Sequence, residues 1–229
     1  MHIKTYSYRF AKEILQHEKY KDAYDELITI CRNCPVPVYE GKSKTQKSKD
    51  VVQQLMNTYF FEAFTMMGWE DEPYATPDTN EDALRSDFRK IFHKGCGIKE
   101  ITIQIEVEFG NVASSYRNYF KFQLSYLYDL TDVCVLIVPS QHLCNRIDSG
   151  VANYEKVLRE IPSAKLSVTV PTLVIGLFDV DDEGVFIDTW NVKAECTDLD
   201  IVKGAKEINA PAHHELIRRY ISRIGLYTS

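Results

Sequence analysis

The residues of this chain best suited to chemistry are two glutamates on one predicted strand. In the stretch ITIQIEVEFGN (residues 101–111), apolar residues alternate with polar ones, which is typical of a strand with one buried face. Glu106 and Glu108 are two positions apart, so their carboxylates point the same way and repel each other unless a cation lies between them. The pattern therefore predicts either a cation site or a face turned to solvent.

A third carboxylate belongs to Asp87, which lies on the preceding predicted strand. Pairing of the two strands would bring Asp87 beside Glu106. Three carboxylates that converge at a strand end would bind a hard divalent cation, which activates water and stabilises charge on a phosphate. The alternative is that Glu106 and Glu108 form the solvent-exposed face of an edge strand.

The elements that must position these side chains follow from hydrophobic periodicity. Helices are expected at about 9–32, 50–67, 115–128, 150–161 and from 213 onward, and strands at 86–92, 100–109, 132–139, 170–178 and 184–190. The last two strands are expected to pair with each other. This order predicts a mixed α/β layered fold with a central sheet flanked by helices.

The length of 229 residues fits a single domain, 1–229. We expect a catalytic core at about 80–190, an N-terminal helical part at 1–70 and a C-terminal helical extension at 191–229. The chain starts without an apolar leader, and its longest apolar run, VCVLIVP, is too short to span a bilayer. We therefore expect a cytoplasmic protein with no membrane partner, whose six cysteines are reduced thiols.

The net charge of −6 argues against a protein that coats nucleic acid without specificity. A local basic cluster in GKSKTQKSKD (41–50), which includes Lys44 and Lys47, is compatible with a specific DNA-binding cleft or with an ordinary solvated surface. A zinc site made of Cys31, Cys34, His93 and Cys96 is disfavoured, because no further zinc signature accompanies these residues. His213 and His214 are expected on the surface at a helix start.

One ordered set of segments resembles a known family. IEVEFGNVASSYRNYFKFQLSYL, DVCVLIVP, RIDSGVANYEKVL and VPTLVIGLF are similar to the type II restriction endonucleases of the BamHI, BglII and BstYI group. The resemblance covers most of residues 40–178. It implies the PD-(D/E)xK nuclease fold and a homodimer without a nucleotide cofactor, with Mg²⁺-dependent cleavage of a short palindrome in double-stranded DNA to leave 5′-phosphate and 3′-hydroxyl ends.

The resemblance also implies residue roles. Glu106 matches the metal-binding acid, and Glu108 falls in the position that holds Lys in the superfamily pattern and Glu in BamHI. Asp87 best matches the first Asp of the motif, although its distance from Glu106 is longer than in BstYI, so Asp82 is the second candidate. In this interpretation Asp87 and Glu106 hold Mg²⁺, and Glu108 orients or deprotonates the attacking water.

Several residues are expected to contact DNA. By resemblance Asn111 and Arg117 face base pairs, and a GATC-containing site would rest on these two residues; Asn pairs with adenine and Arg with guanine in the major groove. The resemblance extends this role to Ser114 in the Ser/Ala-rich turn and to Asp148 and Ser149. Lys44, Lys47 and Lys121 are expected to bind phosphates.

Each of these roles has a structural alternative. Asn111 follows Gly110 and fits a turn. Arg117 and Lys121 are four residues apart, so they fit a basic stripe on a helix surface. Asp148 or Ser149 fits the N-cap of the next helix.

The predicted helix 115–128 is apolar on two sides, which suits burial between the core and a second subunit. The two stripes consist of Tyr119, Phe122 and Tyr126, and of Tyr116, Phe120, Leu124 and Leu127. Plain core packing is the alternative. The competing functions are another nuclease of the same fold that acts in repair or junction resolution, a dimeric DNA-binding protein without catalysis, and an unrelated metal-binding domain.

Overall fold

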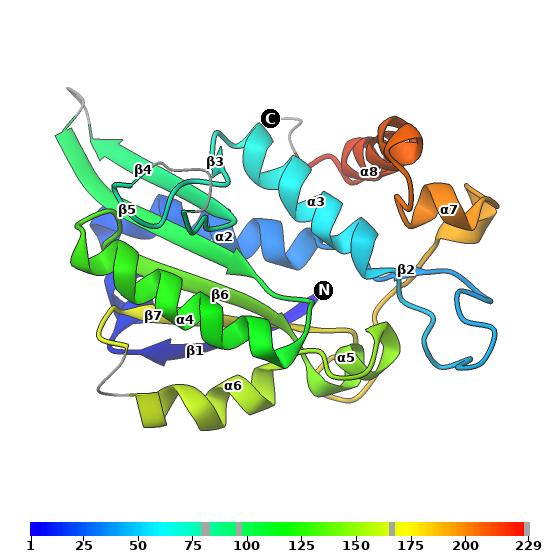
Figure 1. The fold of residues 1–229 in the computed structure, drawn as a ribbon, viewed down its shortest axis with the longest axis horizontal. Coiled ribbons are helices and arrows are strands. Elements are labelled where there is room, and N and C mark those ends of the chain that lie inside the picture. Colours follow the sequence, from blue (N-terminus) through cyan, green and yellow to red (C-terminus); the bar gives the residue numbers. More distant parts are fainter. Residues whose placement is uncertain (79–82, 95–97, 165–167, 227–229) are drawn as a thin grey trace.

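A six-stranded mixed sheet forms the centre of the molecule (Figure 1). The computed structural model describes residues 1–78, 83–94, 98–164 and 168–226, although the side chains at 94, 98–100, 113–114 and 164 lie outside the description. The strand order is β1 (His2–Tyr8), β7 (Thr172–Phe178), β6 (Val133–Pro139), β5 (Ile98–Val107), β4 (Phe88–Lys94) and β3 (Glu70–Asp71). The mixed α/β fold with a central sheet is confirmed.

Three strands at the centre of the sheet, β5, β6 and β7, run parallel, and the flanking strands β1, β4 and β3 pair antiparallel. β4 and β5 form the expected hairpin, in which Phe88 pairs with Ile105 and Lys90 pairs with Ile103. A separate parallel pair joins β2 (Pro37–Val38) to β8 (Trp190–Asn191). This register places Asp87, the residue before Phe88, opposite Glu106 near the end of β5.

Helices cover both faces of the sheet (Figure 1). They are α1 (Ala11–Leu15), α2 (Lys21–Asn33), α3 (Gln53–Met66), α4 (Val112–Leu127), α5 (Gln141–Ile147), α6 (Tyr154–Glu160), α7 (Leu199–Val202) and α8 (Ala210–Ile224). α2 and α3 pack on one face, and α4 and α6 pack on the other. No helix in the described part of the chain is long and apolar enough to cross a membrane.

Strand β6 shows how the two faces divide the core. Its residues Val133, Val135 and Ile137 belong to the cluster under α2 and α3, whereas Cys134 and Leu136 belong to the cluster under α4 and α6. Alternate residues of a strand point to opposite faces, so a continuous apolar run is expected for a strand buried on both sides. The prediction of a central strand at this position is confirmed.

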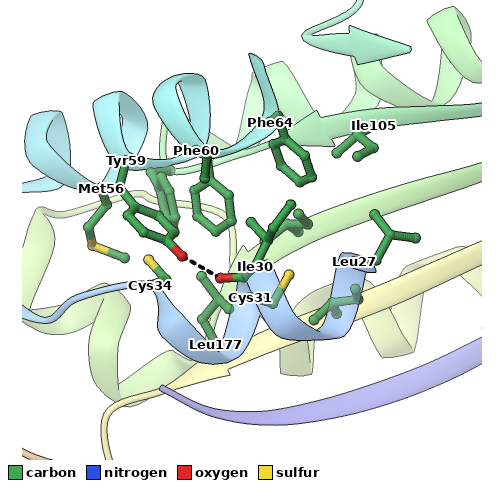
Figure 2. Close-up of a cluster of buried hydrophobic side chains, with 14 of the residues drawn as sticks. Leu27, Ile30, Cys31, Cys34, Met56, Tyr59, Phe60, Phe64, Ile105 and Leu177 are labelled. Carbon is green, nitrogen blue, oxygen red and sulfur yellow. Dashed lines mark hydrogen bonds between the residues drawn. The ribbon is translucent and has the colours of Figure 1, made fainter. Parts of the chain in front are cut away.

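The larger core cluster joins α2 and α3 to the sheet (Figure 2). The Tyr59 hydroxyl donates a hydrogen bond of 2.8 Å to the Ile30 carbonyl, which ties α3 to α2. Phe60 and Phe64 stack on the same side of α3 and point toward the sheet (Figure 2). This packing holds α2 and α3 together as one layer on the face of the sheet opposite α4.

The N-terminal segment differs from the expectation of one helix at 9–32. His2–Tyr8 form strand β1, and Arg9 and Phe10 adopt left-handed backbone conformations with φ of 52° and 63°. Such a conformation interrupts regular structure, so the chain turns at this point before α1 begins. The expected N-terminal helical part therefore also contains an edge strand of the main sheet.

The expected pairing of 184–190 with 170–178 is wrong. β1 occupies that edge of β7, with His2 opposite Phe178 and Tyr8 opposite Thr172. Within 184–190, Phe186 makes an isolated bridge to Val180, and Trp190 begins β8. A segment far away in sequence, β1, occupies this edge of the sheet. Local sequence patterns do not reveal such a pairing.

Candidate active site

The polar face of β5 is buried rather than open to solvent. Gln104, Glu106 and Glu108 are 0%, 1% and 7% exposed, because α4 covers the sheet on this side. The alternative of a solvent-exposed edge strand is therefore wrong. Two acidic side chains buried in this way require partners, since an isolated buried charge is strongly disfavoured.

Asp87 and Glu106 lie close together across the hairpin, as the sequence predicted. Phe88 pairs with Ile105, and Asp87 Oδ2 accepts a hydrogen bond of 2.7 Å from the Val107 amide. Burial raises the pKa of Asp87, and the Val107 bond opposes this shift. For Glu106, burial and then the Asp87 charge raise the pKa to about 8, while Lys121 and Ser86 act in the opposite direction.

Glu106 has one oxygen engaged and one free. Lys121, from α4, forms a buried ion pair with Oε2 of Glu106. In the part of the chain that the structure describes, Oε1 of Glu106 is buried and makes no hydrogen bond, and the Ser86 hydroxyl, which lies near enough to lower the pKa of Glu106, is likewise buried without a bond. Lys121 is 7% exposed, so the alternative of a basic surface stripe is wrong for this residue.

Glu108 is held differently. Its Oε1 accepts a bond of 2.7 Å from the Gly110 amide, and its Oε2 accepts a bond of 3.0 Å from Asn118 Nδ2. Burial raises the pKa of Glu108, and both of these bonds oppose the shift. A Cβ atom at position 110 would lie 2.8 Å from Glu108 Oε1, so glycine allows this close approach.

The three carboxylates do not form a ready-made metal centre. Within the described residues, no group of three or more His, Cys, Asp or Glu side chains is arranged to hold a metal ion. The expected convergence of three carboxylates is therefore corrected to a pair, Asp87 and Glu106, with Glu108 bound to Gly110 and Asn118 beside them. This pair fits Mg²⁺, which takes one or two carboxylates and keeps several waters, and the unpartnered Oε1 of Glu106 is an available oxygen ligand.

Two further acids near Asp87 were missed in the sequence. Asp71 and Glu72 line a cavity of about 240 Å³ together with Asp87, and their charges raise the pKa of Asp87 further. The Glu72 amide donates to the Asp87 carbonyl at 3.0 Å, and Glu72 has a left-handed φ of 48°. The acidic loop EDEPY was visible as composition, but its place beside Asp87 depends on the pairing of β3 with β4.

The proposed catalytic residues and two DNA-contacting candidates, Arg117 and Lys121, share an open, polar pocket. It has a volume of about 300 Å³ and is lined by Arg85, Asp87, Glu106, Val107, Glu108, Arg117, Asn118 and Lys121. Arg117 is exposed and reaches this pocket from α4. Asn118 was not predicted from the sequence. The signal available for it was its place beside Arg117 and three residues before Lys121 on one helix.

The remaining recognition candidates gather beside the end of β5. Asn111 and Val151 form an isolated bridge, and the Val112 amide donates to the Gly150 carbonyl at 2.9 Å. These contacts attach the exposed loop with Asp148 and Ser149 to the loop that carries Asn111. The N-cap alternative for Asp148 and Ser149 is wrong, because α6 begins after Asn153, whose side chain accepts from the Lys156 amide.

Other candidates lie apart from this pocket or outside the description. Lys44 and Lys47 are exposed and line a separate cavity of about 650 Å³, with Lys193 and acidic neighbours. Asp82 and the side chain of Ser114 lie outside the described residues. Cys31 and Cys34 are buried, which raises the pKa of both thiols, and Cys96 also lies outside the description.

Comparison with known proteins places this geometry in a family. The model of the family described as restriction endonuclease BglII/BglIII matches residues 3–177. The chain belongs to the BglII/BglIII restriction endonuclease family. The family expected from the sequence is confirmed, and with it the assignment of the chain as a type II restriction endonuclease, a site-specific deoxyribonuclease.

Solved structures agree with this family at the level of the fold. The structure of BglII complexed with a DNA 16-mer matches with a TM-score of 0.60 at 16% identity, over 80% of this chain and 78% of that chain. Free BglII matches with a TM-score of 0.50 at 16% identity, over 80% of this chain and 81% of that chain. No curated protein sequence matches the chain.

Proposed function

We propose that this restriction endonuclease is a homodimer that uses Mg²⁺ to cut both strands of a short palindrome in double-stranded DNA. The ends would carry 5′-phosphate and 3′-hydroxyl groups. The observation that carries the proposal is the pair of buried carboxylates on the β4–β5 hairpin, Asp87 and Glu106, with a buried oxygen of Glu106 left without a partner among the described residues.

Asp87 and Glu106 would hold the metal. Mg²⁺, when bound there, would supply Lewis-acid polarisation of the scissile phosphate and a lowered pKa for a bound water. Oxygen ligands from two carboxylates match the preference of this ion. Asp71 and Glu72 add negative charge on the far side of Asp87, which favours a cation at this position.

Glu108 would orient or deprotonate the attacking water. Gly110 and Asn118 fix its carboxylate from two sides, and each oxygen retains a second lone pair for the water. In-line attack joins the water oxygen to phosphorus and breaks the bond to the 3′ oxygen, which leaves as a hydroxyl. The bonds to Gly110 and Asn118 hold the carboxylate in one orientation during this step.

Asn111, Arg117, Asp148 and Ser149 would read base edges, with Ser114 beside them. Arg117 lines the catalytic pocket, and the bridge between Asn111 and Val151 joins the segment after β5 to the loop that carries Asp148 and Ser149, which supports a shared DNA-contacting surface. Asn111 and Arg117 suit adenine and guanine respectively, which is the basis for a GATC-containing site. Lys44 and Lys47 would bind backbone phosphates outside the site, because contacts of this kind position the protein without reading sequence.

A second copy of the chain would pack against α4. Tyr119 and Phe122 of this helix face the sheet, whereas Tyr116, Phe120 and Leu127 are 54%, 58% and 67% exposed. The Tyr116 hydroxyl donates to Glu160 of α6 at 3.1 Å, so the two helices form one outer layer. A two-fold symmetric assembly of this kind would match a palindromic target.

The experiment that tests the proposal is digestion of a sequenced plasmid mixture with Mg²⁺, followed by sequencing of the fragment ends. Discrete fragments that share one palindrome are expected, and cutting should be lost with EDTA and in Glu106→Ala. Glu26→Ala is the matched control, because Glu26 also pairs with a partly buried lysine, Lys90, away from the pocket. Intact DNA with wild-type protein and Mg²⁺ would overturn the catalytic assignment.

Random cutting or cutting only at branched DNA in the same assay would favour a nuclease of repair or junction resolution. Tight binding of one sequence without cutting would favour a DNA-binding protein that lacks catalysis. Neither alternative has a specific observation in its favour, and the family match supports the restriction enzyme.

A further inference from the structure

The position two residues after the metal-binding acid carries no cation in this chain. The position two residues after Glu106, which holds Lys in the superfamily pattern, is Glu108. Both oxygens of Glu108 are engaged by Gly110 and Asn118. The position after the strand that holds Lys in that pattern therefore supplies no positive charge to the phosphate.

Helix α4 brings a cation to the same place. Lys121 pairs with Glu106, and Asn118, three residues earlier, bonds to Glu108. Residues three apart lie on one face of a helix, so this face of α4 contacts both acids of the strand, one residue to each. Lys121, Asp87 and Arg117 line one polar pocket, which places the ammonium group where a phosphate would enter.

In the described part of the chain, Lys121 has fewer hydrogen-bond partners than Lys90, which indicates that its role is not limited to stabilising the fold. Lys90 is a partly buried lysine whose Nζ donates to both oxygens of Glu26 and to the Met67 carbonyl. Within the described residues, Nζ of Lys121 donates to Glu106 alone, so two of its three N–H groups are available. Burying an ion pair gives little net stability, and an incompletely satisfied ammonium group on a pocket wall suits a ligand.

We propose that Lys121 is a catalytic residue that supplies, from helix α4, the positive charge that is absent at position 108. Its ammonium group donates to a non-bridging oxygen of the scissile phosphate and stabilises the charge that develops there during attack. Lys121 transfers no proton, and the bonds formed and broken are those of the hydrolysis itself. This inference rests on the proposed function and deepens it.

The same geometry gives Lys121 a second effect. In the structure it occupies one oxygen of Glu106, so it competes with a metal ion for that carboxylate. A metal ion at Oε1 would reduce the negative charge that holds Lys121 at Oε2, so the ammonium group could then turn toward the phosphate. Removal of Lys121 should therefore strengthen metal binding while it weakens cleavage.

The test compares Lys121→Met, Lys121→Arg and, as a matched control, Lys90→Met. Single-turnover cleavage with Mg²⁺ is measured on a duplex with the mapped site, and Ca²⁺ binding without DNA is measured by calorimetry. Loss of one preorganised donor at a developing charge costs about 10²–10³-fold in rate. We expect a loss of this size in Lys121→Met, partial recovery in Lys121→Arg, and tighter Ca²⁺ binding in Lys121→Met.

Lys90→Met should lower the melting temperature but cleave at the wild-type rate when assayed below it. Cleavage by Lys121→Met at the wild-type rate would overturn the inference and leave the proposed function intact. An equal loss in Lys121→Arg and Lys121→Met, with unchanged Ca²⁺ affinity and a lower melting temperature, would also overturn it by assigning Lys121 to folding. Wild-type protein that does not cleave would instead contradict the proposed function.

Discussion

Glu108 shows how one carboxylate is fixed by its neighbours. The Gly110 amide and Asn118 each hold one of its oxygens, and the approach of Gly110 leaves no space for a Cβ atom. A hydrogen bond to a charged group contributes about 1.5–3 kcal/mol. The orientation of Glu108 therefore depends on a residue that has no side chain.

Gly110→Ala should displace the Glu108 carboxylate, because the new Cβ would lie 2.8 Å from Oε1. We expect a loss of about 1–3 kcal/mol in the free energy of unfolding, as measured by chemical denaturation. The cleavage rate should fall as well, if Glu108 orients water. In a Glu108→Ala background the same substitution should cost far less, and an equal cost in both backgrounds would contradict the contact.

His213 is buried rather than exposed, so the surface position expected for it is wrong. The side chain is 4% exposed, its Nδ1 lies 3.0 Å from the Ile201 carbonyl, and its Nε2 lies 2.7 Å from the Thr58 hydroxyl. Burial lowers the pKa of His213 from its ordinary value of 6.5, and the bond to Ile201 opposes this shift. The folded state therefore favours the neutral imidazole.

This pKa shift gives a pH dependence with a definite sign. Below about pH 6.5 the unfolded chain binds a proton at His213 more readily than the folded chain, so stability falls as the pH is lowered. We expect His213→Gln to lose less unfolding free energy than wild type between pH 7.5 and 5.5. Parallel denaturation curves at the two pH values would measure this difference, and identical pH slopes would refute the prediction.

At the scale of elements, helix α6 begins at a residue that the sequence did not single out. Asn153 caps it, with Oδ1 accepting from the Lys156 amide at 3.0 Å, whereas Asp148 is exposed and follows α5. Two backbone hydrogen bonds, from the Val112 amide to the Gly150 carbonyl and from the Ala152 amide to the Gly110 carbonyl, hold the chain before this cap against the segment between β5 and α4. The start of α6 is therefore set by tertiary contacts.

Asn153→Ala should cost about 1 kcal/mol of unfolding free energy, because it removes the N-cap bond. Asp148→Ala is the matched control, and an exposed loop position of this kind should change stability by no more than about 0.5 kcal/mol. Thermal and chemical denaturation of both variants would measure the two costs. The reverse ranking would show that α6 starts near Asp148.

For the whole molecule, the outer side of α4 is an exposed apolar surface. Phe120 is 58% exposed on this helix, next to a stripe that faces the sheet. A helix with two apolar sides leaves one of them exposed in a monomer. Burial of this side between two copies would remove that exposed area.

Phe120→Asp should convert the proposed dimer to a monomer, because it buries a charge in an apolar contact. Sedimentation velocity would give the mass, and plasmid digestion should show a parallel loss of double-strand cutting. Ile208→Asp is the matched control, since Ile208 is 84% exposed and lies far along the chain, before α8. A dimer that persists in Phe120→Asp would place the subunit interface elsewhere.

The local pattern of the sequence was sufficient for several features. Alternation and apolar runs identified β5, β6 and β7, helical spacing identified α3 and α4, and the hairpin placed Asp87 beside Glu106. These features depend on contacts between residues that are close in sequence or on the burial of a whole face. Composition and periodicity report such contacts directly.

The tertiary structure alone decided the rest. β1 pairs with β7 across more than 160 residues, Asp71 and Glu72 reach Asp87 through strand pairing, and Lys121 meets Glu106 because α4 packs over β5. A lysine at helical spacing looks the same in sequence whether it faces solvent or a buried carboxylate. The distinction arises only when distant segments pack, because burial and partner are properties of the folded chain.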